Sequence, residues 1–356
     1  MARKHVRMLI LLSLTVLIKV FSLFPPAVEQ YYSTGIYPYI AVIQRMLLGW
    51  IPFSVGDFFY AVAGIWFLAQ AVLIIKRIKH KQADGKYFLS VAKRGMKGAL
   101  TVYVSFNLLW GLNYNRTGIS SQLKLNNYYY SDKELLSVTK LLAEKLNALQ
   151  NASEHSRPQL DRKKYLFGQA VKSYYNIKST TPLQYSYPSV KPSIYSYLGN
   201  YLGFTGYYNP FSGEAQVNTT VPLFVRPFTV CHEIGHQLGY AKESEANFAG
   251  YLSAAASTDT SFLYSVYFDM YLYASRYLYF SDSAAWKQVR QQLSPGVIKD
   301  RDDLSQFLTK YSTPVQEVID RLYSKYLMAN EQPSGKMSYN EVVAMLIAYH
   351  RKYGKI

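Results

Sequence analysis

An uncharged run of 18 residues, from Phe58 to Ile75, most restricts how this chain can fold. A helix of that length and apolarity can cross the hydrocarbon core of a bilayer. Two shorter apolar runs, Met8 to Phe24 and Gly98 to Leu112, stand on either side of it. The sequence therefore predicts a membrane region over residues 1–112 with three spans, at about 8–24, 58–75 and 98–112.

Basic residues gather beside these apolar runs. Residues 1–97 carry 13 Lys and Arg against three acidic residues, and eight of the 13 lie in residues 76–97, between the second and third spans. By the positive-inside rule this loop and the N-terminus face the cytoplasm, which places residues 113–356 on the extracytoplasmic side. Basic charge in this position indicates contact with lipid headgroups rather than with nucleic acid, and no nucleic-acid motif accompanies it.

Two segments of the membrane region have other possible roles. The first run could be a signal peptide, but no small-x-small cleavage site follows and Pro25-Pro26 ends it, so we expect an uncleaved anchor. Residues 37–53 are apolar but hold Gln44, Arg45 and two prolines, and an arginine inside a bilayer is costly. We expect them to lie along the outer leaflet. A fourth span there, which would turn the later domain inward, is the alternative.

A second strong feature is the H-E-x-x-H pattern formed by His232, Glu233 and His236. Residues four apart lie on the same face of a helix, so the two imidazoles can aim at one Zn²⁺. Glu233 points to the side where an activated water would sit, and its carboxylate can act as the general base. The chain holds only six histidines, so a chance match is a weak competitor. The alternative interpretation of this pattern is a helix whose two histidines only pack or cap and bind no metal.

The residues after the motif supply a third ligand. Gly239 suits the left-handed residue that ends a helix, and a second helical run, Glu243 to Ala256, follows. Glu243 is the predicted third ligand. Asn247, one turn later, is the predicted group that orients a ligand imidazole, and small residues on that face would let the two helices lie close. Glu245 is the rival ligand, although its own face carries the apolar residues typical of packing.

These motifs resemble known families. Residues 243–247 resemble the E-x-x-A-D element of gluzincin-type membrane proteases, with Asn247 in place of the aspartate. More closely, the chain resembles a bacterial membrane family called domain of unknown function 3810, grouped with the zincin peptidases. The matching segments are Tyr31–Pro38, Gly49–Asp57, Thr205–Asn218 and the zinc motif. The resemblance implies a multi-pass protein of the bacterial cytoplasmic (inner) membrane, mainly α, whose transmembrane helices precede a zincin-like metalloprotease domain with a small β element.

Residues 113–356 are predicted to form this mostly helical extracytoplasmic zinc domain. Glu214 to Thr220 is the best strand candidate, within a loop-rich region. The resemblance implies a sheet-edge strand there that binds extended peptide; an ordinary hairpin is the alternative. The lone Cys231 permits no internal disulfide and reads as a small packed thiol. The helical runs are 132–152, 163–174, 261–279, 284–293, 302–311, 314–329 and 338–353.

The leading functional hypothesis is a membrane-anchored zinc metallopeptidase, with Zn²⁺ as cofactor and a peptide or protein as substrate. Such an enzyme needs a donor for the developing oxyanion, and Arg226, Tyr339 and His350 are candidates among many tyrosines. The alternatives are a non-catalytic envelope scaffold or binding protein with a structural metal site, and a zinc hydrolase acting on cell-wall or lipid-linked material. Substrate and oligomeric state stay open at this stage.

Overall fold

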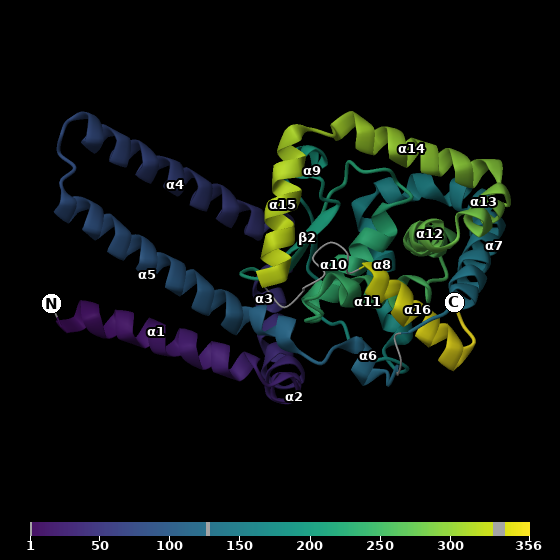
Figure 1. Cartoon of the computed structure of the whole chain (residues 1–356), viewed down its shortest axis with the longest axis horizontal. Coiled ribbons are helices and arrows are strands. Elements are labelled where there is room, and N and C mark those ends of the chain that lie inside the picture. Colours follow the sequence, from purple (N-terminus) through teal and green to yellow (C-terminus); the bar gives the residue numbers. More distant parts are fainter. Residues whose placement is uncertain (1, 126–128, 330–338) are drawn as a thin grey trace.

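The computed structural model describes residues 2–125, 129–329 and 339–356. A mainly helical body surrounds a small three-stranded sheet, and three long helices extend from one side of the body (Figure 1). This confirms the predicted mainly α class. The elements of the body are η2 (Gly111–Asn115), α6 (Ile119–Gln122), α7 (Asp132–Ser156), η3 (Arg157–Asp161), α8 (Lys163–Ile177), β1 (Val190–Pro192), α9 (Ser196–Leu202), β2 (Gly206–Asn209), β3 (Glu214–Val217), α10 (Arg226–Gln237), α11 (Glu243–Ala254), α12 (Thr260–Ser281), α13 (Ser283–Gln291), α14 (Pro295–Tyr311), α15 (Pro314–Ala329) and α16 (Tyr339–Tyr353).

The three extended helices are α1 (Ala2–Ser22), α4 (Val55–Lys79) and α5 (Gly85–Leu109). Among the described residues, α4 is the one helix long and apolar enough by itself to cross a membrane, and none of its apolar window is buried. Its 25 residues extend about 37 Å, against a hydrocarbon core of about 30 Å. The predicted span 98–112 falls mostly within the second half of α5, which does not pass this criterion, so a third span stays a prediction.

The segment 37–53 contains α3 (Tyr37–Leu48), which follows α2 (Pro25–Ala27) and the π-helix η1 (Val28–Ile36). The chain bends by 102° between Val6–Ser22 and Pro25–Leu48. These two segments are apolar and long enough for a membrane span only when taken together, as one bent pair. One face of α3 is buried against the body, where Arg45 donates hydrogen bonds to the carbonyl oxygens of Ser186 and Gln237. The other face exposes apolar side chains, which are Tyr39, Ile43, Met46 and Leu47.

The sheet corrects one expectation. Its strand order is β1-β3-β2, with β1 parallel and β2 antiparallel to β3, so β3 is central. The prediction that residues 214–220 form an edge strand is therefore wrong, and β2 lies at an edge instead. The family resemblance implied an edge strand, but all four side chains of β3 are buried. Glu214, for example, accepts hydrogen bonds from the backbone N–H groups of Val55 (3.2 Å) and Gly56 (2.7 Å).

Those hydrogen bonds attach α4 to the sheet. Ser54 caps the helix by accepting from the backbone N–H of Asp57, and Glu214 adds a carboxylate at the positive end of the helix. The buried side chain of Asp57 in turn accepts from the backbone N–H of Ile194 at 2.8 Å and from the hydroxyl of Tyr207 on β2. The orientation of α4 is therefore fixed by charged and polar groups of the sheet itself.

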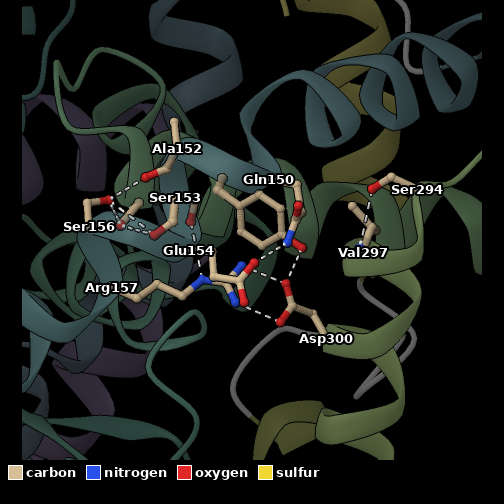
Figure 2. A network of polar contacts seen from close by, with 11 residues as sticks. Gln150, Ala152, Ser153, Glu154, Ser156, Arg157, Ser294, Val297 and Asp300 are labelled. Carbon is tan, nitrogen blue, oxygen red and sulfur yellow. Dashed lines mark hydrogen bonds and ion pairs between the residues drawn. The ribbon is translucent and has the colours of Figure 1, made fainter.

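A buried ion pair connects α14 to the long helix α7, which packs along α12. Arg157, just after α7, makes two parallel hydrogen bonds of 2.7 and 2.6 Å with the carboxylate of Asp300 on α14 (Figure 2). The hydroxyl of Tyr264 on α12 donates to the same carboxylate at 2.5 Å. Asp300 thus holds three helical segments together at one buried point.

We expect Asp300→Ala to lower the free energy of unfolding by about 3 kcal/mol, because it leaves a largely buried guanidinium without its partner. Chemical denaturation of the detergent-solubilised protein measures the change. Asp303→Ala removes an exposed carboxylate from the same helix and serves as the control. Equal losses in the two variants would contradict the role given to the ion pair.

Candidate metal centre

The close packing of α10 against α11 builds the centre. Gly239, with φ of +85°, ends α10 in the left-handed conformation that its position predicted. A Cβ on Gly250 of α11 would lie only 3.0 Å from the backbone nitrogen of His232 on α10. Gly235 of α10 lies similarly close to Ala246 of α11. Small residues on both faces therefore allow the approach that brings the start of α11 to the histidines.

Two imidazoles and one carboxylate converge at this contact. The Nε2 atom of His232 lies 3.4 Å from Oε2 of Glu243, and Nε2 of His236 lies 3.7 Å from Oε1 of Glu243. Ligand atoms of His232, Glu233 and His236 all lie within 4.8 Å of one another. Two imidazoles and one carboxylate are a donor set that suits Zn²⁺ with a fourth position left open. The residues present therefore fit a zinc ion.

The tautomer of His236 is set by the backbone. Its Nδ1 lies 2.8 Å from the carbonyl oxygen of Tyr240, and a carbonyl only accepts, so Nδ1 carries the hydrogen. The lone pair of Nε2 then faces Glu243, as a metal ligand requires. The Nδ1 of His232 has no hydrogen-bond partner among the described residues. Asn247 and the partly buried Asp269 line the same cavity, and the charge of Asp269 interacts with the His232 ring.

Burial and charge separate the pKa values of the three groups. Burial lowers the pKa of His232, but its hydrogen bond with Glu243 and the charges of Glu233 and Glu243 outweigh this and raise it to about 9. Burial raises the pKa of Glu243, but the two histidines bring it down to about 2. Burial and the neighbouring His232 charge lower the pKa of His236 to about 4. Near neutral pH, the pair His232–Glu243 is therefore ionised and His236 is neutral.

We expect the zinc affinity of the metal-stripped protein to rise by about tenfold per pH unit between pH 6 and 8. In this range Glu243 is already ionised and His236 already neutral, whereas His232 keeps its proton until about pH 9 and must release it to bind zinc. Calorimetry in two buffers of different ionisation enthalpy measures both the affinity and the proton released. An affinity that does not change with pH in this range would contradict the ionised pair.

Glu233 is buried beside the edge strand β2. Only 3% of the residue is exposed, and its Oε2 has no hydrogen-bond partner among the described residues. Burial raises its pKa to about 8, against the lowering effect of His232. A Cβ on Gly206 of β2 would lie 2.6 Å from Oε1 and 2.8 Å from Cγ of Glu233. The backbone of β2 therefore passes directly along the carboxylate, with no side chain between them.

The centre opens into a cavity of about 890 Å³. Charged side chains in the described lining belong to the metal cluster or stand next to it, and most of the other lining side chains are aromatic or aliphatic. The lining comes from α4, α5, η2, α9, β2, α10, α11, α12 and α15, and from the segments between α5 and η2, before α9, between α9 and β2, after β2 and before α10. Parts of the chain more than 200 residues apart thus share one wall.

Tyr323 of α15 is a site residue that the sequence did not identify. Its hydroxyl donates to Oε1 of Glu243 at 2.6 Å, and burial together with Glu243 raises the pKa of Tyr323. It is one of 35 tyrosines and lies 80 residues after Glu243, so no local pattern marked it. Gly206 and Asp269 were likewise not identified.

The predicted oxyanion donors lie elsewhere. Arg226 pairs with Asp161 at 3.0 Å and donates to the carbonyl oxygen of Val221 at 2.9 Å, and it is not among the described residues that line the cavity. His350 of α16 is also outside that lining. The side chain of Tyr339 lies outside the described part of the chain.

Glu245, the rival ligand, and Cys231 are both outside the cavity lining that the structure describes. Glu245 packs against Gly118, where an added Cβ would lie 1.7 Å from its Oε1, and burial raises the pKa of Glu245 to about 7. The structure thus places Glu243, and not Glu245, beside both imidazoles. Cys231 is fully buried, and Ser253 donates to its sulfur at 3.8 Å, as the packed-thiol interpretation expects.

Comparisons with known proteins give a family without an assigned activity. No curated protein and no solved structure matches the chain. A family model described as "Protein of unknown function (DUF3810)" matches residues 32–347, which is most of the sequence and includes the metal centre. This match confirms the predicted family of unknown function: the chain belongs to the DUF3810 family.

Proposed function

We propose that this protein is a membrane-anchored zinc metallopeptidase. One observation carries the proposal: His232, His236 and Glu243 converge on one point, while Glu233 lies beside them against an edge strand in the same cavity. A cluster that only stabilised the fold would need neither a second carboxylate, that of Glu233, nor a cavity in front of it.

Each group has a role in this proposal. His232, His236 and Glu243 would hold Zn²⁺, which lowers the pKa of a water and polarises a carbonyl oxygen when bound. Glu233 takes the proton of the attacking water and passes it to the leaving amine. The hydroxyl of Tyr323, which donates to Glu243 at 2.6 Å, would serve as the donor for the developing oxyanion.

The edge strand gives a place for the substrate backbone. β2 pairs with β3 on one side, and its residues Gly206, Tyr207 and Tyr208 line the cavity. An extended peptide can add to such an edge through main-chain hydrogen bonds. A peptide bound opposite Gly206 would have its scissile bond close to Glu233. The role first given to residues 214–220 thus passes to β2.

The direction of the three extended helices supports an extracytoplasmic site. The N-terminus and the turn between α4 and α5 lie at the end of these helices that is farthest from the body (Figure 1). The basic residues 76–97 lie around that turn. If this end faces the cytoplasm, as the positive-inside rule requires, the body and its metal centre face outward from the bacterial cytoplasmic membrane.

A peptide-library digest tests the proposal. Purified protein is incubated with the library, the products are identified by mass spectrometry, and a sample stripped with a chelator is compared with one reloaded with zinc. We expect cleavage that is lost on stripping and restored on reloading. Tightly bound metal with no cleavage of any library member would favour a scaffold with a structural metal site.

Gly206→Val offers a test of the strand's position. The new side chain would occupy the space of the Glu233 carboxylate, so we expect peptide cleavage to fall by at least about tenfold while zinc content is kept. Gly168→Ala on α8 is the control, because a Cβ there meets nothing within 4 Å. An unchanged cleavage rate in Gly206→Val would show that β2 does not position the base.

A further inference from the structure

We propose that the substrate of this site is a membrane-anchored polypeptide, cut next to the bilayer surface in an apolar stretch. This inference rests on the proposed function, because it names the substrate class of the same site.

The first argument is where the membrane helices meet the cavity. Tyr60 of α4 lines the cavity, and the apolar run of that helix begins only two residues earlier, at Phe58. At 1.5 Å per residue, Tyr60 lies about 3 Å along the helix from that boundary. Phe106 and Trp110, at the body end of α5, line the same cavity. This part of the cavity wall therefore lies at the outer end of the spans expected from the sequence.

The second argument is the orientation of α3. The chain turns by 102° between α1 and α3, so α3 lies along the membrane surface when α1 runs across it. Its apolar face is exposed, while Gln44 on its other side donates to the carbonyl oxygens of Pro210 (2.9 Å) and Phe211 (3.3 Å). Pro210 and Phe211 line the cavity. A helix suited to the interface is thus attached directly to the cavity wall.

The third argument is the chemistry of the wall formed by α9 and α15, which pack against each other. Leu198 of α9 lines the cavity and is half exposed, and so are Tyr323 and Tyr326 of α15. The outer side of α15 exposes further apolar side chains, which are Val315, Val318 and Leu322. Exposed apolar side chains grouped at a site mark contact with a membrane or a hydrophobic partner.

The lining also distinguishes a polypeptide from a lipid headgroup. None of the described residues that line the cavity is Lys or Arg. A phosphate-linked lipid or cell-wall precursor would bring negative charge past Glu233, Glu243 and Asp269, with the proposed zinc ion and no lysine or arginine of the described lining to balance it. An uncharged apolar peptide stretch has no such cost, and it fits the aromatic wall.

The test asks where along a chain the enzyme cuts. A cassette of apolar residues, chosen from the peptide-library products, is placed twice in a synthetic polypeptide that carries a Leu/Ala transmembrane helix. One copy stands within five residues of that helix and the other about 30 residues away, up to roughly 100 Å from the bilayer. Both copies share one anchor, so their surface concentration is the same. Vesicles carry the full-length protein and this polypeptide.

We expect the membrane-proximal copy to be cut at least tenfold faster than the distal copy. Equal cutting, or faster cutting of the distal copy, would overturn the inference while leaving the peptidase proposal in place. Failure to cut either copy while the free cassette is cut would overturn it as well. If neither the polypeptide nor any free peptide is cut, it is the proposed function that fails.

Binding of the anchored polypeptide is measured separately from its cleavage. The Glu233→Gln protein is used for this, so that the bound polypeptide is not turned over. A photoreactive amino acid replaces Leu198, which is 50% exposed at the cavity, or Leu308 on α14, which is 53% exposed outside its lining. We expect the membrane-proximal copy of the cassette to cross-link to the protein at position 198. We expect no cross-link at position 308. Equal cross-linking at the two positions, or none at 198, would contradict entry beside α9.

Discussion

Glu233→Gln is expected to lower peptide cleavage by on the order of 10² to 10⁴, the usual contribution of a general base. The amide keeps the size of the side chain but cannot take a proton from water. Glu233 is buried and its Oε2 has no partner among the described residues, so the substitution breaks no hydrogen bond of that atom. Cleavage is measured on a fluorogenic peptide chosen from the library digest.

Zinc content separates this effect from a general loss of structure. We expect Glu233→Gln to bind zinc as the wild type does, because His232, His236 and Glu243 are unchanged. Glu144→Gln, an exposed change of the same kind on α7, controls for the substitution itself. Wild-type cleavage rates in Glu233→Gln would refute its role as the base.

Glu243→Ala is expected to weaken zinc binding by more than the 10- to 100-fold typical of residues that only orient a ligand. Its two oxygens lie 3.4 and 3.7 Å from the Nε2 atoms of the two histidines, so the substitution removes the carboxylate predicted to complete the ligand set. Competition with a chelator of known affinity measures the change.

Glu245→Ala is the matched control, since it removes a buried glutamate from the same helix, two residues further on. Its side chain packs against Gly118 rather than the histidines, so we expect wild-type zinc affinity. The opposite ranking, with zinc lost from Glu245→Ala and kept by Glu243→Ala, would assign the third ligand to Glu245.

Much of the helical structure could be predicted from the sequence, because helix signals are local. The predicted run 132–152 became α7, Asp132–Ser156, whose start is marked by the capping box of Ser131 and Glu134. The sheet was less predictable from the sequence than the helices. Glu214 and Gln216 alternate with apolar residues as on a half-exposed strand, yet both are buried. Their partners include Ser54 and the N-terminus of α4, about 160 residues earlier.

The residues of the site also fall into two groups, those that the sequence predicts and those that it does not. His232, Glu233, His236 and Glu243 lie within twelve residues, and helix geometry with one left-handed glycine is enough to bring them together. Tyr323, Gly206 and Asp269 reach the centre through tertiary packing. For them the sequence offers no spacing rule, and only the folded chain shows that they belong to the site.

The most direct test of the central claim is a zinc titration of the metal-stripped protein, with cleavage of the library-derived peptide followed at each step. A zinc peptidase with the site described above predicts cleavage that rises from near zero and reaches its plateau at one zinc per chain. Cleavage that does not depend on zinc, or a protein that binds one zinc per chain and cuts no peptide, would contradict it.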